Sequence, residues 1–89
     1  MKIEFDETKN LINIEKHGFP LSAFSLLDME SAVFHEDNRK EYGEKRIRVY
    51  AFLLGRLCTS AFTIRNDVFR VINFRKANLK EMKKYERER

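Results

Sequence analysis

Arginines are the residues most able to do chemistry in this chain, and two of them frame one short stretch. The stretch from Arg65 to Ala77 reads RNDVFRVINFRKA, with Arg65 and Arg75 at the two ends of a predicted hairpin arm. A guanidinium is permanently charged and donates two parallel hydrogen bonds to phosphate oxygens. The arm therefore favours a site that stabilises negative charge on a phosphate group.

A second candidate for chemistry is the pair Lys16-His17, which ends a predicted helix. Histidine normally titrates near pH 7, as acid–base catalysis requires. The structural alternative is that cations at a helix C-terminus are favoured by the helix dipole whatever the function. The sequence alone leaves both interpretations open.

Charge is unevenly distributed along the chain, whose net charge is +4. Residues 1–36 contain three Lys or Arg and seven Asp or Glu, whereas residues 37–89 contain fifteen and seven. A basic block of this size favours an anionic partner, and nucleic acid is the first expectation. An evenly solvated basic surface is the alternative.

Length and composition limit the class of protein. The 89 residues predict a single domain over 1–89, and no apolar run approaches the roughly 20 residues needed to span a bilayer. The start MKIEFDE does not resemble a signal peptide, so we expect a cytoplasmic protein without membrane contact.

One cysteine, Cys58, permits neither an internal disulfide nor a zinc site by itself, and its apolar surroundings predict an inert buried thiol. Three glycines make a phosphate-cradling loop implausible, and we expect no metal and no cofactor.

Helical patterns dominate the first third of the chain. Met1–Phe5 alternates as a short edge strand, and Asp6 can cap a helix that runs to about His17 and stops at Gly18. Its predicted apolar stripe is Leu11, Ile14 and Ile12. Pro20 suits the first turn of a second helix, which together with the first makes a helical hairpin. The buried face of that second helix is Leu21, Phe24 and Leu27. Asp28–Tyr42 is polar and turn-rich and predicts a loop, although Ala32–His35 could pair as a strand.

From Lys45 the hydrophobic period becomes two. Three strands are expected, ending at Leu53, Ile64 and Phe74, with turns at Gly55-Arg56 and Asn66-Asp67. In the first of these strands one face carries Ile47, Val49, Ala51 and Leu53, and the other carries Arg46, Arg48, Tyr50 and Phe52. Unbroken alternation in the third strand places Arg70 and Arg75 on opposite faces.

Asn78 and Glu81 have capping-box spacing for a last helix, with Leu79, Met82 and Tyr85 turned inward. The predicted fold is α+β, with an N-terminal helical hairpin, an antiparallel meander of three to four strands and a C-terminal helix.

Six motifs follow one another along essentially the whole chain: FDETK, NIEKHG, GEKR, GR…FTIR, RVINFRKA and E-x-x-x-Y. Together they resemble the BrnT family of bacterial type II toxins, relatives of the RelE/ParE superfamily. The resemblance implies a RelE-like ribonuclease that cleaves RNA without a metal and is neutralised by a BrnA-type antitoxin. It also implies that operator DNA is reached only through the toxin–antitoxin complex, which represses its own operon.

The resemblance assigns roles to particular residues. Arg65 and Arg75 fall on the family arginines of T-x-R and R-x-A, and Lys16 and His17 fall on K-H-G; these four are the catalytic candidates. The candidates for RNA binding are Arg46, Arg70, Lys76 and Tyr85. For Arg46 the alternative is a salt bridge to Glu44 or another acid, for Arg70 a solvated or interface charge, and for Tyr85 packing against Met82. The candidates for antitoxin binding, on the outside of the last helix, are Lys80, Lys83 and Lys84.

Two residues beside Arg75 depart from the family pattern. The family usually reads I-S-A-R where this chain has Ile72-Asn73-Phe74-Arg75. The change favours an alternative function, a non-catalytic module that binds antitoxin or nucleic acid. His35 lies outside every matched motif, and we expect no role for it.

Overall fold

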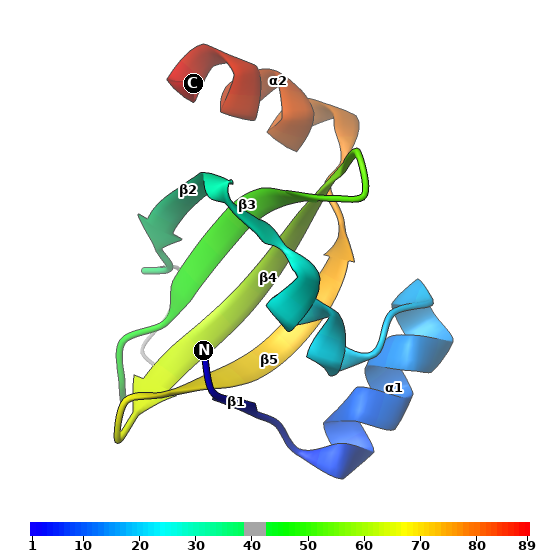
Figure 1. The fold of residues 1–89 in the computed structure, drawn as a ribbon, viewed down its shortest axis with the longest axis vertical. Coiled ribbons are helices and arrows are strands. Elements are labelled where there is room, and N and C mark those ends of the chain that lie inside the picture. The colour runs from blue at the N-terminus through cyan, green and yellow to red at the C-terminus, as the bar shows by residue number, and fades with distance from the viewer. Residues whose placement is uncertain (39–42) are drawn as a thin grey trace.

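Five strands and three helical segments build the fold in the computed structural model, which describes residues 1–38 and 43–89 (Figure 1). In chain order they are β1 (Ile3–Glu4), α1 (Glu7–His17), the 3-10 helix η1 (Leu21–Leu26), β2 (Asp28–Glu36), β3 (Ile47–Leu53), β4 (Arg56–Arg65), β5 (Val68–Lys76) and α2 (Leu79–Glu88). The strand order across the sheet is β1-β5-β4-β3-β2. Strands β2 to β5 form an antiparallel meander, and β1 pairs with β5 in parallel, so the sheet is mixed rather than purely antiparallel.

One face of the sheet, here the η1 face, carries the main core. Phe24 of η1 packs its ring against Phe62 at 5.3 Å and against Phe69 at 5.8 Å between centroids. Figure 1 shows η1 crossing in front of the strands. Buried aromatic and aliphatic side chains provide most of the folding free energy. Cys58 belongs to this core, and burial raises the pKa of its thiol, so the expected buried cysteine is confirmed.

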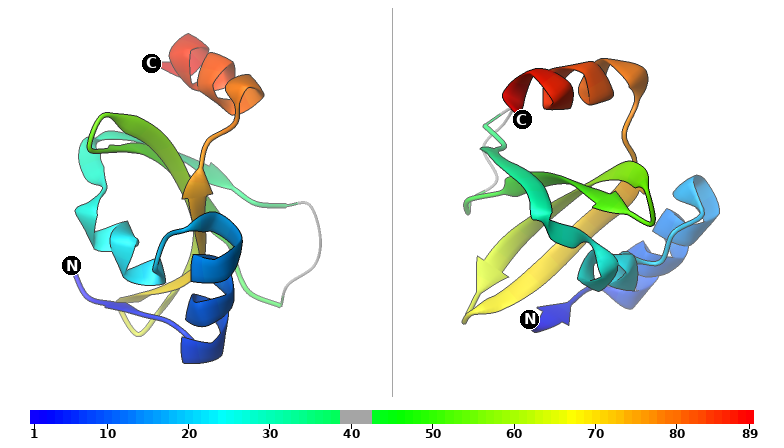
Figure 2. Two further views of the ribbon diagram at one scale, coloured as in Figure 1. Left: turned by 90° about the vertical axis from the view of Figure 1, so that its right-hand side faces the viewer. Right: turned by 45° about the horizontal axis from the view of Figure 1, so that its top comes forward.

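The opposite face, here the α2 face, is covered only at one end. Tyr85 of α2 packs there against Leu57 and Ala77, and its hydroxyl donates to the Ser31 carbonyl at 2.5 Å. Figure 2 shows α2 standing at the end of the sheet away from the N-terminus. The capping box that starts α2 is confirmed, since Asn78 and Glu81 exchange bonds of 2.8 and 2.9 Å. Leu79, expected to face inward, is 66% exposed instead.

The predicted helical hairpin is wrong in its second half. Residues 21–26 form a 3-10 helix, and Pro20 is its N-cap and offers no side-chain hydrogen bond. Short 3-10 segments replace an α-helix where only one or two turns fit between neighbouring elements. Here strand β2 begins two residues after η1 ends, so the chain must leave the helical path at once.

The loop predicted for Asp28–Tyr42 is also wrong over most of its length. Asp28–Glu36 forms β2, paired antiparallel with β3 from Glu36↔Ile47 to Asp28↔Phe52. An edge strand with one exposed face tolerates polar residues, so polarity alone does not distinguish it from a loop. Residues 39–42 of that prediction lie outside the described part of the chain.

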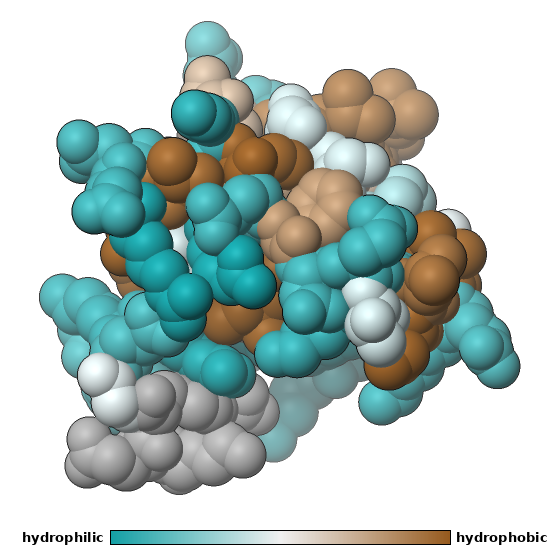
Figure 3. Space-filling view, turned by 90° about the horizontal axis from the view of Figure 1, so that it is seen from below, coloured by the Kyte–Doolittle hydropathy of each residue, from teal (hydrophilic) through white to brown (hydrophobic). Residues whose placement is uncertain are grey.

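Helix α1 has the boundaries expected from its Asp6 cap and from Gly18, which takes a positive φ of 80°, but its buried face is inverted. The predicted stripe of Leu11, Ile12 and Ile14 is exposed, whereas Asn10 and Asn13 are buried. The space-filling view shows exposed hydrophobic surface on the side where Figure 1 places α1 (Figure 3).

The buried asparagines replace missing backbone partners. Asn13 bonds both the N–H and the carbonyl of Phe74, at 3.1 and 2.9 Å, as a neighbouring strand would. Asn10 accepts from the Leu21 N–H at 2.7 Å. Buried backbone groups must be paired; Asn13 does this for β5 beyond the end of β1, and Asn10 does it for the first residue of η1.

The β4–β5 turn agrees with the prediction, whereas the β3–β4 turn is shifted by one residue. Asn66 and Asp67 both have positive φ, 51° and 64°, as a two-residue type I′ hairpin requires. The earlier turn is at Leu54-Gly55 rather than Gly55-Arg56. No helix within the described segments is long and apolar enough to cross a membrane.

Candidate functional site

A β-bulge in β5 decides which arginines share a face. The pairs Ala61↔Asn73 and Phe62↔Val71 leave Ile72 without a partner in β4. One extra residue reverses the alternation, so Arg70 and Arg75 lie on the same α2 face instead of on opposite faces. The prediction of opposite faces rested on unbroken alternation and is therefore wrong.

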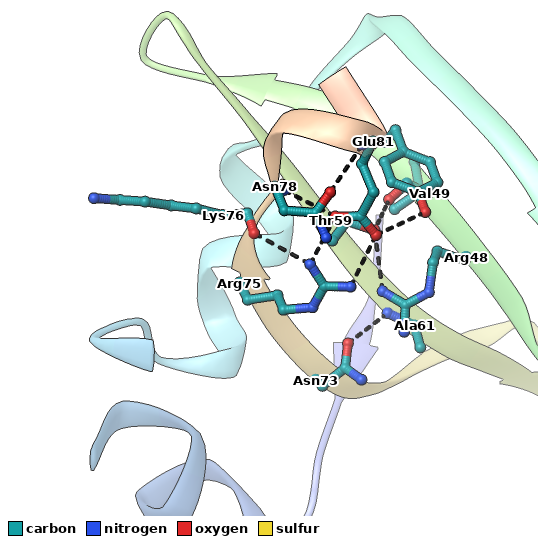
Figure 4. A network of polar contacts seen from close by, with 10 residues as sticks. Arg48, Val49, Thr59, Ala61, Asn73, Arg75, Lys76, Asn78 and Glu81 are labelled. Atoms are coloured by element: carbon teal, nitrogen blue, oxygen red, sulfur yellow. Dashed lines mark hydrogen bonds and ion pairs between the residues drawn. The ribbon is translucent and has the colours of Figure 1, made fainter. Parts of the chain in front are cut away.

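Arg75 is held by a carboxylate of α2. Its two terminal nitrogens donate to Glu81 Oε1 and Oε2 at 2.8 and 3.0 Å, and one of them also donates to the Lys76 carbonyl at 3.2 Å (Figure 4). The hydrogen bonds from Arg75, helped by the Asn78 backbone N–H, lower the pKa of Glu81 to about 2. Glu81 is therefore ionised at neutral pH and is a poor proton acceptor there.

Arg48 and Tyr50 of β3 complete the group. Arg48 donates to Thr59 Oγ1 at 3.0 Å, and the Tyr50 hydroxyl donates to Glu81 Oε2 at 3.2 Å. Burial and the Glu81 charge raise the pKa of Tyr50, so its phenol stays protonated and acts as a donor. The side chains from β3, β5 and α2 thus converge above the sheet, as Figure 4 shows.

A cavity of about 280 Å³, here the larger pocket, opens over this group. His35 and Lys84 stand at its wall, and His35 Nε2 lies 3.0 Å from Glu88 Oε2. The remaining lining residues are Glu36, Asp37, Asn38, Arg48, Tyr50, Arg75 and Glu81. Sequence patterns did not mark Arg48, Tyr50 and His35 as site residues. The strand alternation had placed Arg48 and Tyr50 on one face, but no local signal identified that face as the one beneath Arg75.

Lys16 and His17 lie in a second cavity of about 210 Å³, here the smaller pocket, between α1 and β5. It is also lined by Lys9, Ile12, Asn13, Ile72 and Asn73. Burial and then the charges of Lys16 and Arg75 lower the pKa of His17. The imidazole is therefore mostly neutral at pH 7, and Arg75 is close enough to influence it.

Arg65 and Arg70 lie away from both pockets. Arg65 donates to Glu44 at 3.0 and 2.5 Å, and Arg46 also contributes to the lowered pKa of that carboxyl group. Arg65 is six residues along β4 from Thr59, the partner of Arg75, which is about 20 Å in a strand. Arg70 makes an ion pair with Glu4 of β1 at 2.6 Å. The structure thus does not bring the two candidate catalytic arginines together.

The other predicted RNA-binding residues are scattered. Arg46 precedes β3, and its carbonyl accepts from the Asp37 N–H at 2.9 Å. Lys76 extends away from Arg75 in Figure 4. Tyr85 is 8% exposed and lies in a buried cluster against which Met82 packs, in agreement with the alternative interpretation of this residue. Among the predicted antitoxin-binding lysines, Lys84 reaches the larger pocket, whereas Lys80 and Lys83 are exposed on α2.

The two departures from the family pattern have structural partners. Asn73 Oδ1 accepts from the Ala61 N–H at 3.0 Å, next to the bulge that leaves Ile72 unpaired. Phe74 is fully buried on the η1 face and packs against Phe19 at 5.2 Å between ring centroids. Phe74 therefore points away from Arg75, and the Asn73 amide lies beside it.

Residues that could hold a metal are sparse in the described segments, where no group of three His, Cys, Asp or Glu side chains comes together. Among known protein families, a model described as ribonuclease toxin, BrnT, of type II toxin-antitoxin system matches residues 5–81. This range includes every lining residue of the two pockets except Lys84. No curated protein matches the chain.

Proposed function

The chain belongs to the BrnT family of ribonuclease toxins of type II toxin–antitoxin systems, and from this premise we propose that it cleaves RNA in the larger pocket without a metal ion. The observation that carries the proposal is the convergence of Arg48, Tyr50 and Arg75 in one cavity. Two guanidinium groups and a phenol can supply the positive charge and hydrogen-bond donors that a transferring phosphate needs.

The proposed reaction is an internal transfer. The ribose 2′-oxygen loses its proton and attacks the adjacent phosphorus, while the bond to the 5′-oxygen breaks and that oxygen takes up a proton. The products are a 2′,3′-cyclic phosphate and a 5′-hydroxyl. Arg75 and Arg48 stabilise the charge on the phosphate oxygens, and Tyr50 donates a hydrogen bond to them.

Two histidines compete for the role of proton acceptor. His17 is kept mostly neutral by its lowered pKa, and a neutral imidazole accepts a proton readily. His35 lines the larger pocket itself and is oriented by Glu88. Separate His17→Ala and His35→Ala variants decide between them, because loss of the true base removes the rising limb of the pH–rate profile.

Glu81 occupies the position that a phosphate would take on Arg75. A carboxylate that accepts from both terminal nitrogens imitates the paired oxygens of a phosphate. RNA must therefore displace Glu81 or share Arg75 with it. The pairing holds Arg75 in an orientation that suits an anion. The negative charge of Glu81, however, competes with the phosphate for Arg75.

The experiment that tests the proposal compares cleavage of single-stranded RNA in EDTA by the wild type and by Arg75→Ala/Glu81→Gln. The second change avoids a half-buried carboxylate that has lost its ion-pair partner, which would confuse activity with folding. We expect the double variant to lose at least a hundredfold in rate, while Glu81→Gln alone and the control Arg56→Gln stay active. Full cleavage by the double variant, or cleavage that stops in EDTA, contradicts the proposal.

Type II toxins are neutralised by a protein, and for this chain we assign that role to a BrnA-type antitoxin that also carries the complex to operator DNA. The basic surface of α2 suits an acidic antitoxin segment laid across Lys80, Lys83 and Lys84. Binding there would also close the larger pocket at Lys84. Charge reversal with Lys80→Glu/Lys83→Glu should weaken the complex, and an unchanged affinity would exclude α2 from the interface.

A second candidate function is a non-catalytic antitoxin-binding module. The favouring observation is that Glu81 already neutralises Arg75 in the free protein. Under this hypothesis the wild type binds antitoxin tightly but cuts no RNA, and its overexpression leaves growth unchanged. Growth arrest that depends on Arg75 would decide against it.

A further inference from the structure

The smaller pocket has the chemistry of a phosphate-binding site, and of its lining residues the motifs had marked only Lys16 and His17 for a role, that of catalytic candidates. Two exposed cations, Lys9 and Lys16, stand on the α1 side, each about one helical turn from the buried Asn13. Ile12 and Ile72 provide apolar walls. Lysines bind phosphate groups by charge, and apolar side chains beside them can contact the sugar or base of the same nucleotide.

Asn73 adds a donor of fixed orientation. Its Oδ1 is held by the Ala61 N–H at 3.0 Å, so the amide cannot rotate freely. Figure 4 shows the amide nitrogen turned away from that bond, and the described residues offer it no hydrogen-bond acceptor. The Asn73 side chain is therefore held in one orientation at the smaller pocket, which the residue helps to line.

The two pockets are next to each other. Asn73 lines the smaller pocket and Arg75 the larger one, and both side chains lie on the α2 face of β5. Two residues of a strand span about 6.6 Å, comparable to the length of one nucleotide unit. Burial, Lys16 and then Arg75 lower the pKa of His17, which lines the smaller pocket.

We propose that the smaller pocket is a subsite for the nucleotide next to the cleaved bond of a single-stranded RNA. Lys9 and Lys16 bind its phosphate, Asn73 donates to the same group, and Ile12 and Ile72 contact the ribose or base. The inference rests on the proposed ribonuclease function, and it adds that the substrate is an unpaired strand read over two consecutive nucleotides. A duplex would keep its bases stacked and could not present them to this pocket.

The test uses two lengths of RNA. One is a dinucleotide with a single phosphate, and the other carries one further nucleotide at either end; each is made unmodified and with a 2′-O-methyl group that prevents cleavage. For the wild type we expect the longer methylated RNA to bind roughly tenfold tighter, as one charge-assisted phosphate contact gives. Lys9→Gln/Lys16→Gln should lose this gain, and Lys9→Gln, which keeps the catalytic candidate Lys16, should lose part of it without changing dinucleotide affinity.

Matched variants separate the subsite from general charge effects. Lys2→Gln/Arg56→Gln removes the same charge from residues that line neither pocket, and it should keep the tenfold gain. Asn73→Asp keeps the acceptor for Ala61 but replaces the donor by a negative charge that repels phosphate, so it should reduce the gain more than Lys2→Gln/Arg56→Gln does. A gain that persists in Lys9→Gln/Lys16→Gln overturns the subsite. A wild type that binds with the gain but leaves unmodified RNA intact overturns the ribonuclease proposal instead.

Discussion

Glu81→Gln is the substitution that isolates the charge facing Arg75. Gln has nearly the same shape, can still accept from the Asn78 N–H in a capping box and can still meet Tyr50. It removes the negative charge that accepts two hydrogen bonds from Arg75. The variant therefore changes the electrostatics of the larger pocket and little else.

The magnitude follows from the pKa of Glu81, which the Arg75 hydrogen bonds lower from 4.5 to about 2. At about 1.4 kcal/mol per pKa unit, ionised Glu81 contributes roughly 3 kcal/mol to folding. The carboxylate is only 18% exposed, so solvent screens the pair weakly. Because Gln keeps part of the hydrogen bonding, we expect a loss of about 2 kcal/mol at pH 7, or roughly 8–16 °C in Tm for a domain of this size.

The pH dependence gives the sign of the effect. A carboxylate with a lowered folded-state pKa stabilises the protein above its unfolded pKa and loses that contribution as the pH falls through its folded pKa. The difference in unfolding free energy between wild type and Glu81→Gln should thus have its full size above about pH 5 and should disappear as the pH falls from 4.5 to 2. Urea unfolding followed by circular dichroism at several pH values measures it.

The same variant should lower stability but raise the affinity for RNA. With Arg75 released from its carboxylate, affinity for single-stranded RNA should rise severalfold at low salt, because the local potential becomes more positive. A stability difference that does not vary with pH would show that packing, not charge, dominates at Glu81. A fall in RNA affinity would show that Glu81 positions Arg75 instead of competing for it.

Three further predictions concern the framework. Asn13→Ala leaves the buried N–H and carbonyl of Phe74 without partners and should cost about 2–4 kcal/mol in urea unfolding, whereas Leu11→Ala, at an exposed position of the same helix, should stay within about 0.5 kcal/mol. Tyr85→Phe loses the bond to the Ser31 carbonyl and should lower stability by about 1–2 kcal/mol; a neutral result would mean that packing alone fixes α2. Asp67→Gly relieves a positive φ of 64° and should raise the thermal midpoint by a few degrees, with a lowered midpoint contradicting the turn assignment.

Local signals in the sequence determined much of the secondary structure. The Asp6 cap and Gly18 set the ends of α1, the pair Asn78 and Glu81 set the start of α2, and Asn66-Asp67 set the hairpin turn. Each depends on side chains within a few residues of the backbone that they bond. The ordered motifs by themselves also indicated the family, and the family model agrees over residues 5–81.

The tertiary structure decided which residues share a face of the sheet and which face of α1 is buried. The extra residue at Ile72 places Arg70 on the same face as Arg75. This bulge arises from the pairing of β5 with β4, and no local pattern in the sequence of β5 predicts it. The inward turn of Asn13 depends on backbone groups of Phe74, 61 residues away. The sequence already identified Arg75 as a site residue. Arg48, Tyr50 and His35 were recognised only from the strand pairing, which places them beside Arg75 in the larger pocket. Short-range spacing can show that a residue has the right chemistry, but partners far apart in the chain become neighbours only through the register of the sheet.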